Sequence, residues 1–167
     1  MSESETAPKP VYRPISGIAE SLAAIEEVVD TAQNAIRVFD VSLSNRGFNS
    51  PRLTDKLRQF LVSGRAHRLF IALHDTALLE RENPRLLMLL RQFPMSIEIH
   101  RTVSQARDAN DPCVVADDHS VWHQAHFTQQ RAIVALHSPA DAVPIMQRFD
   151  EIWQLSEPAV FASTTGL

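Results

Sequence analysis

The chain has 167 residues, of which 44% are hydrophobic, so it can form one sizeable core but not two ordinary domains. Its apolar stretches fall far short of the roughly 20 residues that cross a bilayer, and no membrane association is expected. With 16 Lys+Arg and 20 Asp+Glu, the chain has a net charge of −4. It lacks the excess of cations that gives general affinity for nucleic acid, so a nucleic-acid partner is not expected either.

The N-terminal part of the chain divides into an arm and the start of a domain. Residues 1–16 contain three prolines among small polar residues, a composition that predicts a disordered arm. A single domain is expected over residues 17–157, followed by a C-terminal tail over residues 158–167. Within the domain, apolar residues spaced three and four apart over 18–32 predict a helix, and the β-branched run at 36–41 predicts the first strand.

Two further helix and strand pairs follow along the chain. Ser50-Pro51 and Asn83-Pro84 each combine a helix-capping residue with a proline suited to the first turn, and each predicts a helix. Strands are predicted after these helices at residues 68–73 and 96–100. Alternation of helix and strand at these lengths predicts parallel strands joined by right-handed crossovers.

The second half of the chain has a different pattern. Short strands are predicted at 113–116, 121–127 and 131–137, too close together for crossovers, so they must pair as antiparallel hairpins. Ser138-Pro139 then begins a final amphipathic helix. The sequence therefore predicts an α/β domain with a mixed, largely parallel sheet flanked by helices.

Several short motifs in this order of elements resemble one half of the phospholipase D superfamily. They are Phe39-Asp40 at the end of the first strand, Gly64 before the second strand, Ile97–His100, Val114–Asp117 and the closing Phe149-Asp150-x-x-Trp153. The resemblance covers about residues 17–155. It implies a phospholipase D-like half-domain.

Catalytic halves of that superfamily carry a His-x-Lys-x4-Asp motif, and here the motif is degenerate. With Asp117 as the motif aspartate, Asn110 stands in place of the histidine and Pro112 in place of the lysine. Taking Asp118 instead restores neither residue. In the superfamily one histidine attacks phosphorus, a second protonates the leaving group, and the lysine neutralises phosphate oxygens. The resemblance therefore implies a pseudoenzyme with a vestigial motif.

The function expected from this resemblance is that of a non-catalytic binding or interaction module. Its partner would be an unidentified protein or a small anionic ligand, and no cofactor is expected. Because the superfamily works as two halves, in one chain or as a dimer, the resemblance also implies a homodimer. A single cysteine, Cys113, and an N-terminus without an export pattern favour the cytoplasm.

Polar residues near the strand ends suggest an alternative, a phosphodiesterase-type hydrolase with a relocated histidine and aspartate site. Asp40 and His100 end the first and third strands, His74 follows the second, and Ser42 and Arg46 lie in the loop after the first. The carboxyl ends of strands line ligand crevices in open α/β sheets, which makes these five residues a candidate cleft. The competing interpretation is that they merely end strands at the surface.

One segment is rich in residue types that bind metals. It contains Cys113, Asp117, Asp118, His119, His123 and His126. The short, tight spacing of structural zinc motifs is missing, and on a strand His123 and His126 point to opposite faces. No metal site is predicted there, and Cys113 is expected to be a small core residue.

Overall fold

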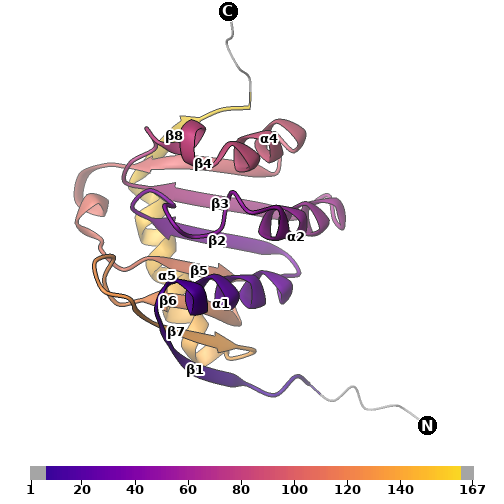
Figure 1. Ribbon diagram of the computed structural model, residues 1–167, viewed down its shortest axis with the longest axis vertical. Helices are drawn as coiled ribbons and strands as arrows, with labels where there is room; N and C mark the ends of the chain where they lie inside the picture. Colours follow the sequence, from indigo (N-terminus) through magenta and orange to yellow (C-terminus); the bar gives the residue numbers. More distant parts are fainter. Residues whose placement is uncertain (1–6, 163–167) are drawn as a thin grey trace, which may run out of the picture.

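The computed structural model describes residues 7–162, which form an eight-stranded mixed sheet with helices on both faces (Figure 1). In their order across the sheet, the strands are β1 (Val11–Ser16), β7 (Arg131–Leu136), β6 (Ser120–Gln124), β5 (Cys113–Ala116), β2 (Ala35–Asp40), β3 (Arg68–Leu73), β4 (Ile97–Thr102) and β8 (Ser156–Val160). The predicted mixed sheet with helical flanks is confirmed. Its parallel pairing is confined to β2, β3 and β4, while the other five pairings are antiparallel.

The helices lie in two layers. Helices α1 (Ile18–Asp30), α2 (Pro51–Val62) and α4 (Pro84–Gln92) cover one face of the sheet, and α5 (Pro139–Gln154) covers the other (Figure 1). Two short helices, α3 (Leu79–Glu82) and the 3-10 helix η1 (Ser104–Asp108), lie in connections. The expected start of α2 is present, since Ser50 Oγ accepts a hydrogen bond from Leu53 N at 3.1 Å and proline occupies the first helical turn.

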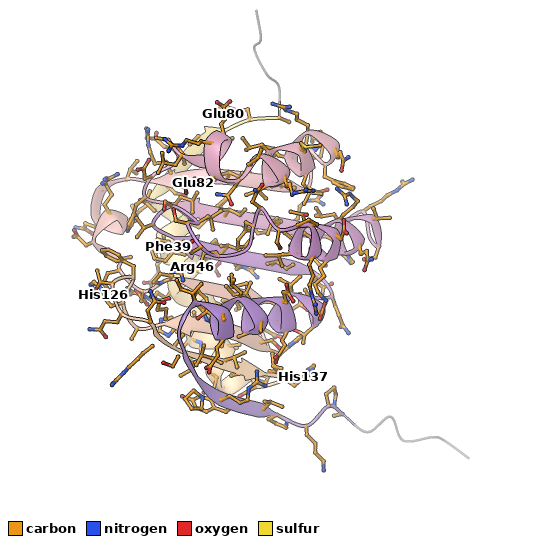
Figure 2. All side chains as sticks on the ribbon, in the orientation of Figure 1. Phe39, Arg46, Glu80, Glu82, His126 and His137 are labelled. Atoms are coloured by element: carbon orange, nitrogen blue, oxygen red, sulfur yellow. The ribbon has the colours of Figure 1, made fainter. Side chains whose placement is uncertain are left out.

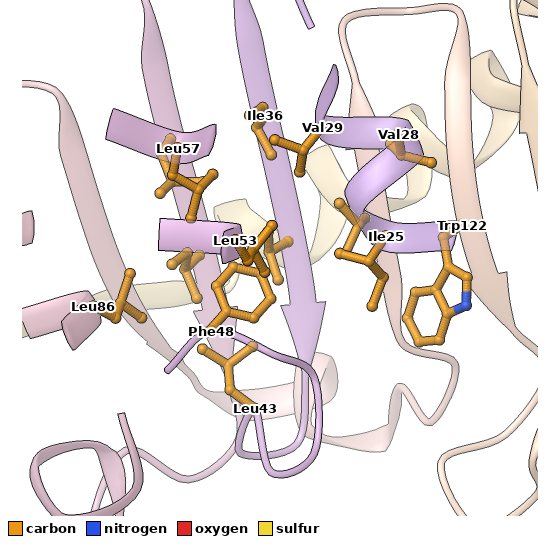
Figure 3. Close-up of a cluster of buried hydrophobic side chains, with 14 of the residues drawn as sticks. Ile25, Val28, Val29, Ile36, Leu43, Phe48, Leu53, Leu57, Leu86 and Trp122 are labelled. Atoms are coloured by element: carbon orange, nitrogen blue, oxygen red, sulfur yellow. The ribbon is translucent and has the colours of Figure 1, made fainter. Parts of the chain in front are cut away.

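Side chains of β2 point alternately to the two faces of the sheet and so contribute to two separate hydrophobic cores. Ile36 and Val38 belong to the core under α1, α2 and α4, whereas Phe39 belongs to the core under α5. Figure 3 shows the first core, in which side chains from α1 and α2 meet those of Leu43 and Phe48 from the loop after β2. That loop is therefore packed into the interior and held in one shape.

Two edge strands correct the expected arm and tail. Residues 11–16, expected to be disordered, form β1 and pair antiparallel with β7, and residues 156–160 form β8 beside β4. Both carry a proline, which an edge strand tolerates because one side of its backbone needs no partner. Residues 1–6 and 163–167, the remainder of the expected arm and tail, lie outside the described residues.

The helices were compared with the length and apolar content that a membrane span requires. Within residues 7–162, none has the length and apolar content needed to cross a membrane.

Candidate functional site

The candidate site lies at the edge of the sheet where β2, β3 and β4 end. Because β5 runs antiparallel to β2, and β6 antiparallel to β5, the start of β5 and the end of β6 lie at the same edge. Figure 2 shows Arg46 and His126 on this side of the molecule and His137 on the opposite side. Loops at the carboxyl ends of parallel strands are where open α/β sheets bind ligands.

A buried ion pair forms the floor of this edge. Arg46 Nε donates to Asp40 Oδ2 at 2.9 Å, and the two side chains are only 10% and 6% exposed. The guanidinium carbon also lies 4.9 Å from the centre of the Trp122 ring, whose Nε1 donates to Ser21 Oγ at 3.3 Å. The arginine is therefore fixed between a carboxylate and an indole, and its charge is largely balanced by Asp40.

The loop between β2 and α2 has an unusual backbone. Leu43, Asn45 and Gly47 all have positive φ, at 66°, 59° and 82°. Asparagine and glycine tolerate this region, but for leucine it carries a cost of about 1–3 kcal/mol. Burial of the Leu43 side chain, which is 1% exposed, offsets that cost. The hydrophobic core therefore holds the loop in a conformation that it would not adopt alone.

A pocket of about 250 Å³ opens beside this loop. Its lining combines the Asp40–Arg46 pair and polar loop residues with two half-exposed apolar side chains, Ile18 and Phe127. Ser42 Oγ lies 3.0 Å from Ser44 Oγ, which donates to Glu82 Oε2 at 2.6 Å. Since the Ser44 proton points at Glu82, Ser42 is the donor to Ser44. The pocket is thus lined by fixed hydrogen-bonding groups.

The three residues that the resemblance predicted as a vestigial motif lie at both ends of β5. At the candidate edge, Asn110 is exposed and its carbonyl accepts from Phe127 N at 2.8 Å, while the carbonyl of Pro112 accepts from Gln124 N at 2.9 Å. Asp117 lies at the opposite edge. Its carboxylate accepts from three backbone N–H groups, those of residues 33, 34 and 35, each at 2.8 Å. Asp117 therefore fixes the start of β2 and faces away from the pocket.

The structure divides the five candidate cleft residues between two places. Asp40, Ser42 and Arg46 line the pocket. His74 lies on the α5 side of the sheet, where its ring contacts Phe39 edge-on at 5.2 Å and its Nε2 donates to Ala109 O at 2.6 Å. The second ring nitrogen of His74, Nδ1, bonds the Thr102 hydroxyl, so both nitrogens are occupied.

His100 lies still farther across the sheet, also on the α5 side. Its imidazole stacks on Trp153 of α5 with ring centres 3.7 Å apart. The register that pairs Phe39 with Ala72 and Ala72 with His100 puts all three on one face, whereas Asp40 points to the other. Asp40, His74 and His100 therefore do not converge on one point.

Sequence reasoning missed a charged cluster between β5, β6 and α5. Asp111 Oδ2 accepts from His123 Nε2 at 2.9 Å, and Arg148 binds both Asp111 oxygens, with its Nη2 2.6 Å from Oδ1. Burial raises the pKa of Asp111, but the hydrogen bonds from His123 and Arg148 outweigh burial and lower that pKa to about 2. Arg148 is 37 positions away in sequence, so no local signal could have found this pair.

The metal-ligand residue types do not gather into one site. In the described part of the chain, no group of three or more His, Cys, Asp or Glu side chains could hold a metal ion. Cys113 is fully buried between the sheet and α5, and burial together with the nearby Asp111 carboxylate raises the pKa of its thiol to about 12. A thiol with so high a pKa is a poor nucleophile.

Comparison with solved structures identifies the class of fold. Nuc, a phospholipase D family member from Salmonella typhimurium, is 14% identical with a TM-score of 0.66, over 90% of this chain and 99% of Nuc. NucT from Helicobacter pylori is 9% identical with a TM-score of 0.61, over 90% of this chain and 100% of NucT. The chain therefore has a phospholipase D-like fold, as the sequence motifs suggested.

Family membership follows from the sequence comparison. A family model described as "Domain of unknown function (DUF7931)" matches residues 18–161, and the chain belongs to that family. Among curated proteins, none matches the sequence.

Two longer proteins contain the same fold as a part. TrmBL2, an archaeal chromatin protein with a novel mode of DNA binding, is 18% identical with a TM-score of 0.65, over 89% of this chain and 55% of TrmBL2. Phosphatidylserine synthase from Haemophilus influenzae is 12% identical with a TM-score of 0.58, over 93% of this chain and 40% of the synthase. The chain thus spans about half of each of these proteins.

Proposed function

We propose that the protein is a non-catalytic phospholipase D-like binding module whose pocket beside Asp40 and Arg46 takes a small anionic ligand. One observation carries the proposal: the motif positions hold Asn110 and Pro112, which contribute only backbone carbonyls to the β5–β6 hairpin. Neither side chain can attack phosphorus, protonate a leaving group or neutralise phosphate as an imidazole and an ammonium do.

The state of the nearby imidazoles supports this proposal. His74 uses both ring nitrogens within the fold, and His123 is tied to Asp111, which Arg148 also binds. A catalytic imidazole must be able to reach the substrate and exchange a proton with it. These two imidazoles instead act as hydrogen-bonding parts of the structure.

Arg46 supports an anionic ligand. A guanidinium has five N–H donors, and Asp40 takes one from Nε and one from Nη2. No other hydrogen bond of this guanidinium occurs within residues 7–162, so donors remain for the oxygens of a ligand. Because Asp40 balances the charge, we expect modest affinity that depends on hydrogen bonds.

The test of inactivity is an assay of purified protein against a generic phosphodiester, bis(p-nitrophenyl) phosphate, and against DNA at neutral pH. We expect no turnover above the buffer rate. His74→Ala, His100→Ala and His123→Ala variants, purified in parallel, serve as controls for contaminating enzymes. Hydrolysis that disappears in any one of these variants would contradict the proposal.

The test of the pocket is an NMR titration with inorganic phosphate. We expect backbone amide shifts in residues 41–47 that are weakened in Asn45→Gly, a variant that keeps the left-handed backbone while removing the amide side chain. Asp118→Ala, which changes an exposed residue near the opposite edge, is the matched control. Shifts scattered over the surface, or equal in both variants, would argue against the pocket.

One observation favours an enzyme instead, a hydrolase whose site would lie outside the predicted cleft of Asp40, His74 and His100. The Asp111–His123 pair joins a carboxylate to an imidazole beside the Arg148 guanidinium, the groups that acid–base catalysis on a phosphodiester would use. The His123 side chain is 24% exposed, so contact with a substrate is possible. Loss of turnover in His123→Ala alone would establish this alternative.

The TrmBL2 likeness makes DNA a partner that needs a direct test, although the sequence argued against it. The charge distribution still disfavours DNA, because eight of the lysine and arginine side chains in residues 7–162 lie against carboxylates. Such pairing halves the number of cations that are free of a carboxylate and able to displace the counterions of a phosphate backbone. We expect a flat titration against DNA at low salt, and salt-dependent binding would revise this view.

A further inference from the structure

A surface formed by the ends of two helices lies at the edge of the sheet opposite the candidate site. Helices α2 and α4 lie next to each other on one face of the sheet, and each leads into the start of a parallel strand at this edge (Figure 1). The two connections are in contact, since Leu69 N donates to Ser96 O at 2.9 Å and side chains of α2 and α4 are hydrogen-bonded. Residues 62–68 and 91–96 therefore form one surface, the basic edge.

Cations without a carboxylate partner are concentrated on this side of the molecule. Of the 16 Lys and Arg side chains, eight lie against carboxylates within residues 7–162. Five of the other eight occur in the stretch from the end of α2 to the end of α4, namely Arg65, Arg68, Arg81, Arg85 and Arg91. Three of them, Arg65, Arg68 and Arg91, belong to the basic edge.

The basic edge contains no carboxylate of its own. Neither of its two segments includes an Asp or a Glu. Glu98 follows closely, but it alternates with Ile97 and Ile99, which lie in the core under α4, so Glu98 points to the other face of the sheet. The exposed Asp118, on the turn after β5, lies beyond β2 and limits the surface on that side. The edge therefore has a local positive charge in a chain whose net charge is −4.

Two large apolar side chains project from the same edge. Met95 is 84% exposed and Val62 is 68% exposed, the highest values among the large hydrophobic residues within residues 7–162. The dipoles of α2 and α4 favour cations at the ends of these helices, but they give no reason for exposed apolar side chains beside the cations. The combination of free arginines and projecting apolar groups indicates a binding surface.

We propose that the basic edge binds the surface of a membrane that contains anionic lipids. The guanidinium groups bind phosphate oxygens of the lipid head groups, while Met95 and Val62 enter the boundary between head groups and acyl chains. The expectation of no membrane association rested on the lack of a spanning segment, and attachment to a membrane surface requires none. A nucleic acid would pair with the arginines, but its phosphates offer no apolar surface to Met95 and Val62.

Attachment through the basic edge has a consequence for the rest of the molecule. The pocket beside Asp40 and Arg46 lies at the opposite edge of the sheet, so it remains open to the solution when the protein is bound. The proposal does not depend on what that pocket binds. Because only three arginines take part, we expect reversible binding that depends on the ionic strength.

The experiment is co-sedimentation of the full chain with phosphatidylcholine vesicles, with and without phosphatidylglycerol, at low and at high salt. We expect binding only to the vesicles that contain phosphatidylglycerol, and weaker binding at high salt, because exposed charges make the contacts. Equal binding to both kinds of vesicle, or binding to neither, would overturn the proposal. Binding of DNA through these arginines without binding of vesicles would replace the membrane by nucleic acid.

Paired variants test the arginines. Arg65→Gln combined with Arg91→Gln is expected to weaken vesicle binding about 25-fold, since each arginine near an anionic surface contributes about fivefold. Lys9→Gln combined with Arg131→Gln removes the same charge from exposed sites at and near the β1–β7 pair and should have a much smaller effect. Equal losses in the two double variants would mean that net charge, and not this edge, controls binding.

A measurement on the unaltered protein does not depend on how the variants fold. In bicelles with spin-labelled phosphatidylglycerol, the methyl signal of Met95 should broaden, whereas that of Met146, on α5 across the sheet, should not. Equal broadening of the two signals, or broadening of Met146 alone, would overturn the assignment of the edge, whatever the outcome at the Asp40 and Arg46 pocket.

Discussion

Asp117 has a role that depends on its carboxylate and on the chain around it. Its two oxygens accept hydrogen bonds from three backbone N–H groups in the turn where α1 ends and β2 begins. Within the described residues, these N–H groups have no other acceptor. Its own φ of 53° turns the chain from β5 toward β6. Asp117, predicted as the aspartate of a vestigial motif, therefore ties the start of β2 to the end of β5.

Replacing Asp117 by alanine is expected to lower the free energy of unfolding by about 1–3 kcal/mol, because three backbone N–H groups, one of them partly buried, lose their acceptor. Urea denaturation followed by circular dichroism measures this change. The control is Asp118→Ala, next in the chain and exposed, which should change stability by less than about 0.5 kcal/mol. Equal effects of the two substitutions would show that the three bonds contribute little.

Asp111 makes the stability of the fold dependent on pH. Its pKa is lowered to about 2 in the folded state, because the ionised carboxylate binds His123 and Arg148. This interaction stabilises the fold fully at pH values above 3.8, the ordinary pKa of the carboxyl in the unfolded chain. This contribution falls as the pH drops from 3.8 through about 2, where the folded state also takes up the proton.

Asp111→Asn is therefore expected to cost about 1–3 kcal/mol at pH 7, and the difference from the unaltered chain should shrink as the pH falls through that range. Denaturation curves at a series of pH values measure the difference. Asp108→Asn, at an exposed site on η1, is the control. A difference that stays constant down to pH 2 would mean that the carboxylate charge is not the cause.

At the scale of elements, the loop between β2 and α2 depends on one buried pair. Asp40 ends β2, and Arg46 reaches back to it across the bend made by Leu43 and Asn45. Breaking one partner leaves the other buried without its counter-charge, which costs far more than the pair itself contributes. The loop and the pocket beside it should therefore respond together to changes in this pair.

Arg46→Met is expected to lower the free energy of unfolding by about 3–5 kcal/mol, because Asp40 is left buried and unpaired. The double variant Asp40→Asn with Arg46→Met should recover much of that loss, since no isolated charge remains. Thermal or chemical denaturation of the two single variants and the double variant completes the cycle. Strictly additive losses would indicate that the side chains act independently.

The elements that sequence patterns predicted are those with local signals. Ser50-Pro51 marks the start of α2. The strands β2 and β3 are marked by short apolar runs, each of which follows a helix. The edge strands β1 and β8 lack such signals, because each contains a proline and neither is a continuous buried run. Their pairing partners are also distant in the sequence.

The candidate site was predictable only in part, for a related reason. Asp40, Ser42 and Arg46 lie within seven positions of one another, and they line one pocket. Side chains alternate within a strand, but the register between strands cannot be read from the sequence, so the face taken by His74 and His100 could not be predicted. The Asp111–Arg148 contact depends on how α5 packs against β6, which local patterns do not encode.

At the scale of the whole molecule, the chain corresponds to one structural unit that other proteins use in different ways. It covers nearly all of Nuc and NucT but only 40% of the Haemophilus influenzae synthase. A unit of this kind is a candidate for self-association, because paired copies of one subunit are the commonest oligomers. Half-exposed Ile18 and Phe127 at the rim of the pocket offer an apolar surface for such contact.

We expect the protein to be a homodimer in solution, with twice the monomer mass of 18.7 kDa by light scattering coupled to size exclusion. Phe127 is 44% exposed, and Phe127→Glu should shift the equilibrium toward monomer by placing two charges in the contact. Met95 is 84% exposed and lies at the turn after α4, so Met95→Glu is the control that should keep the dimer. If Met95→Glu dissociated the dimer and Phe127→Glu did not, the contact would lie over α4, away from the pocket. A monomer at every concentration would contradict this expectation.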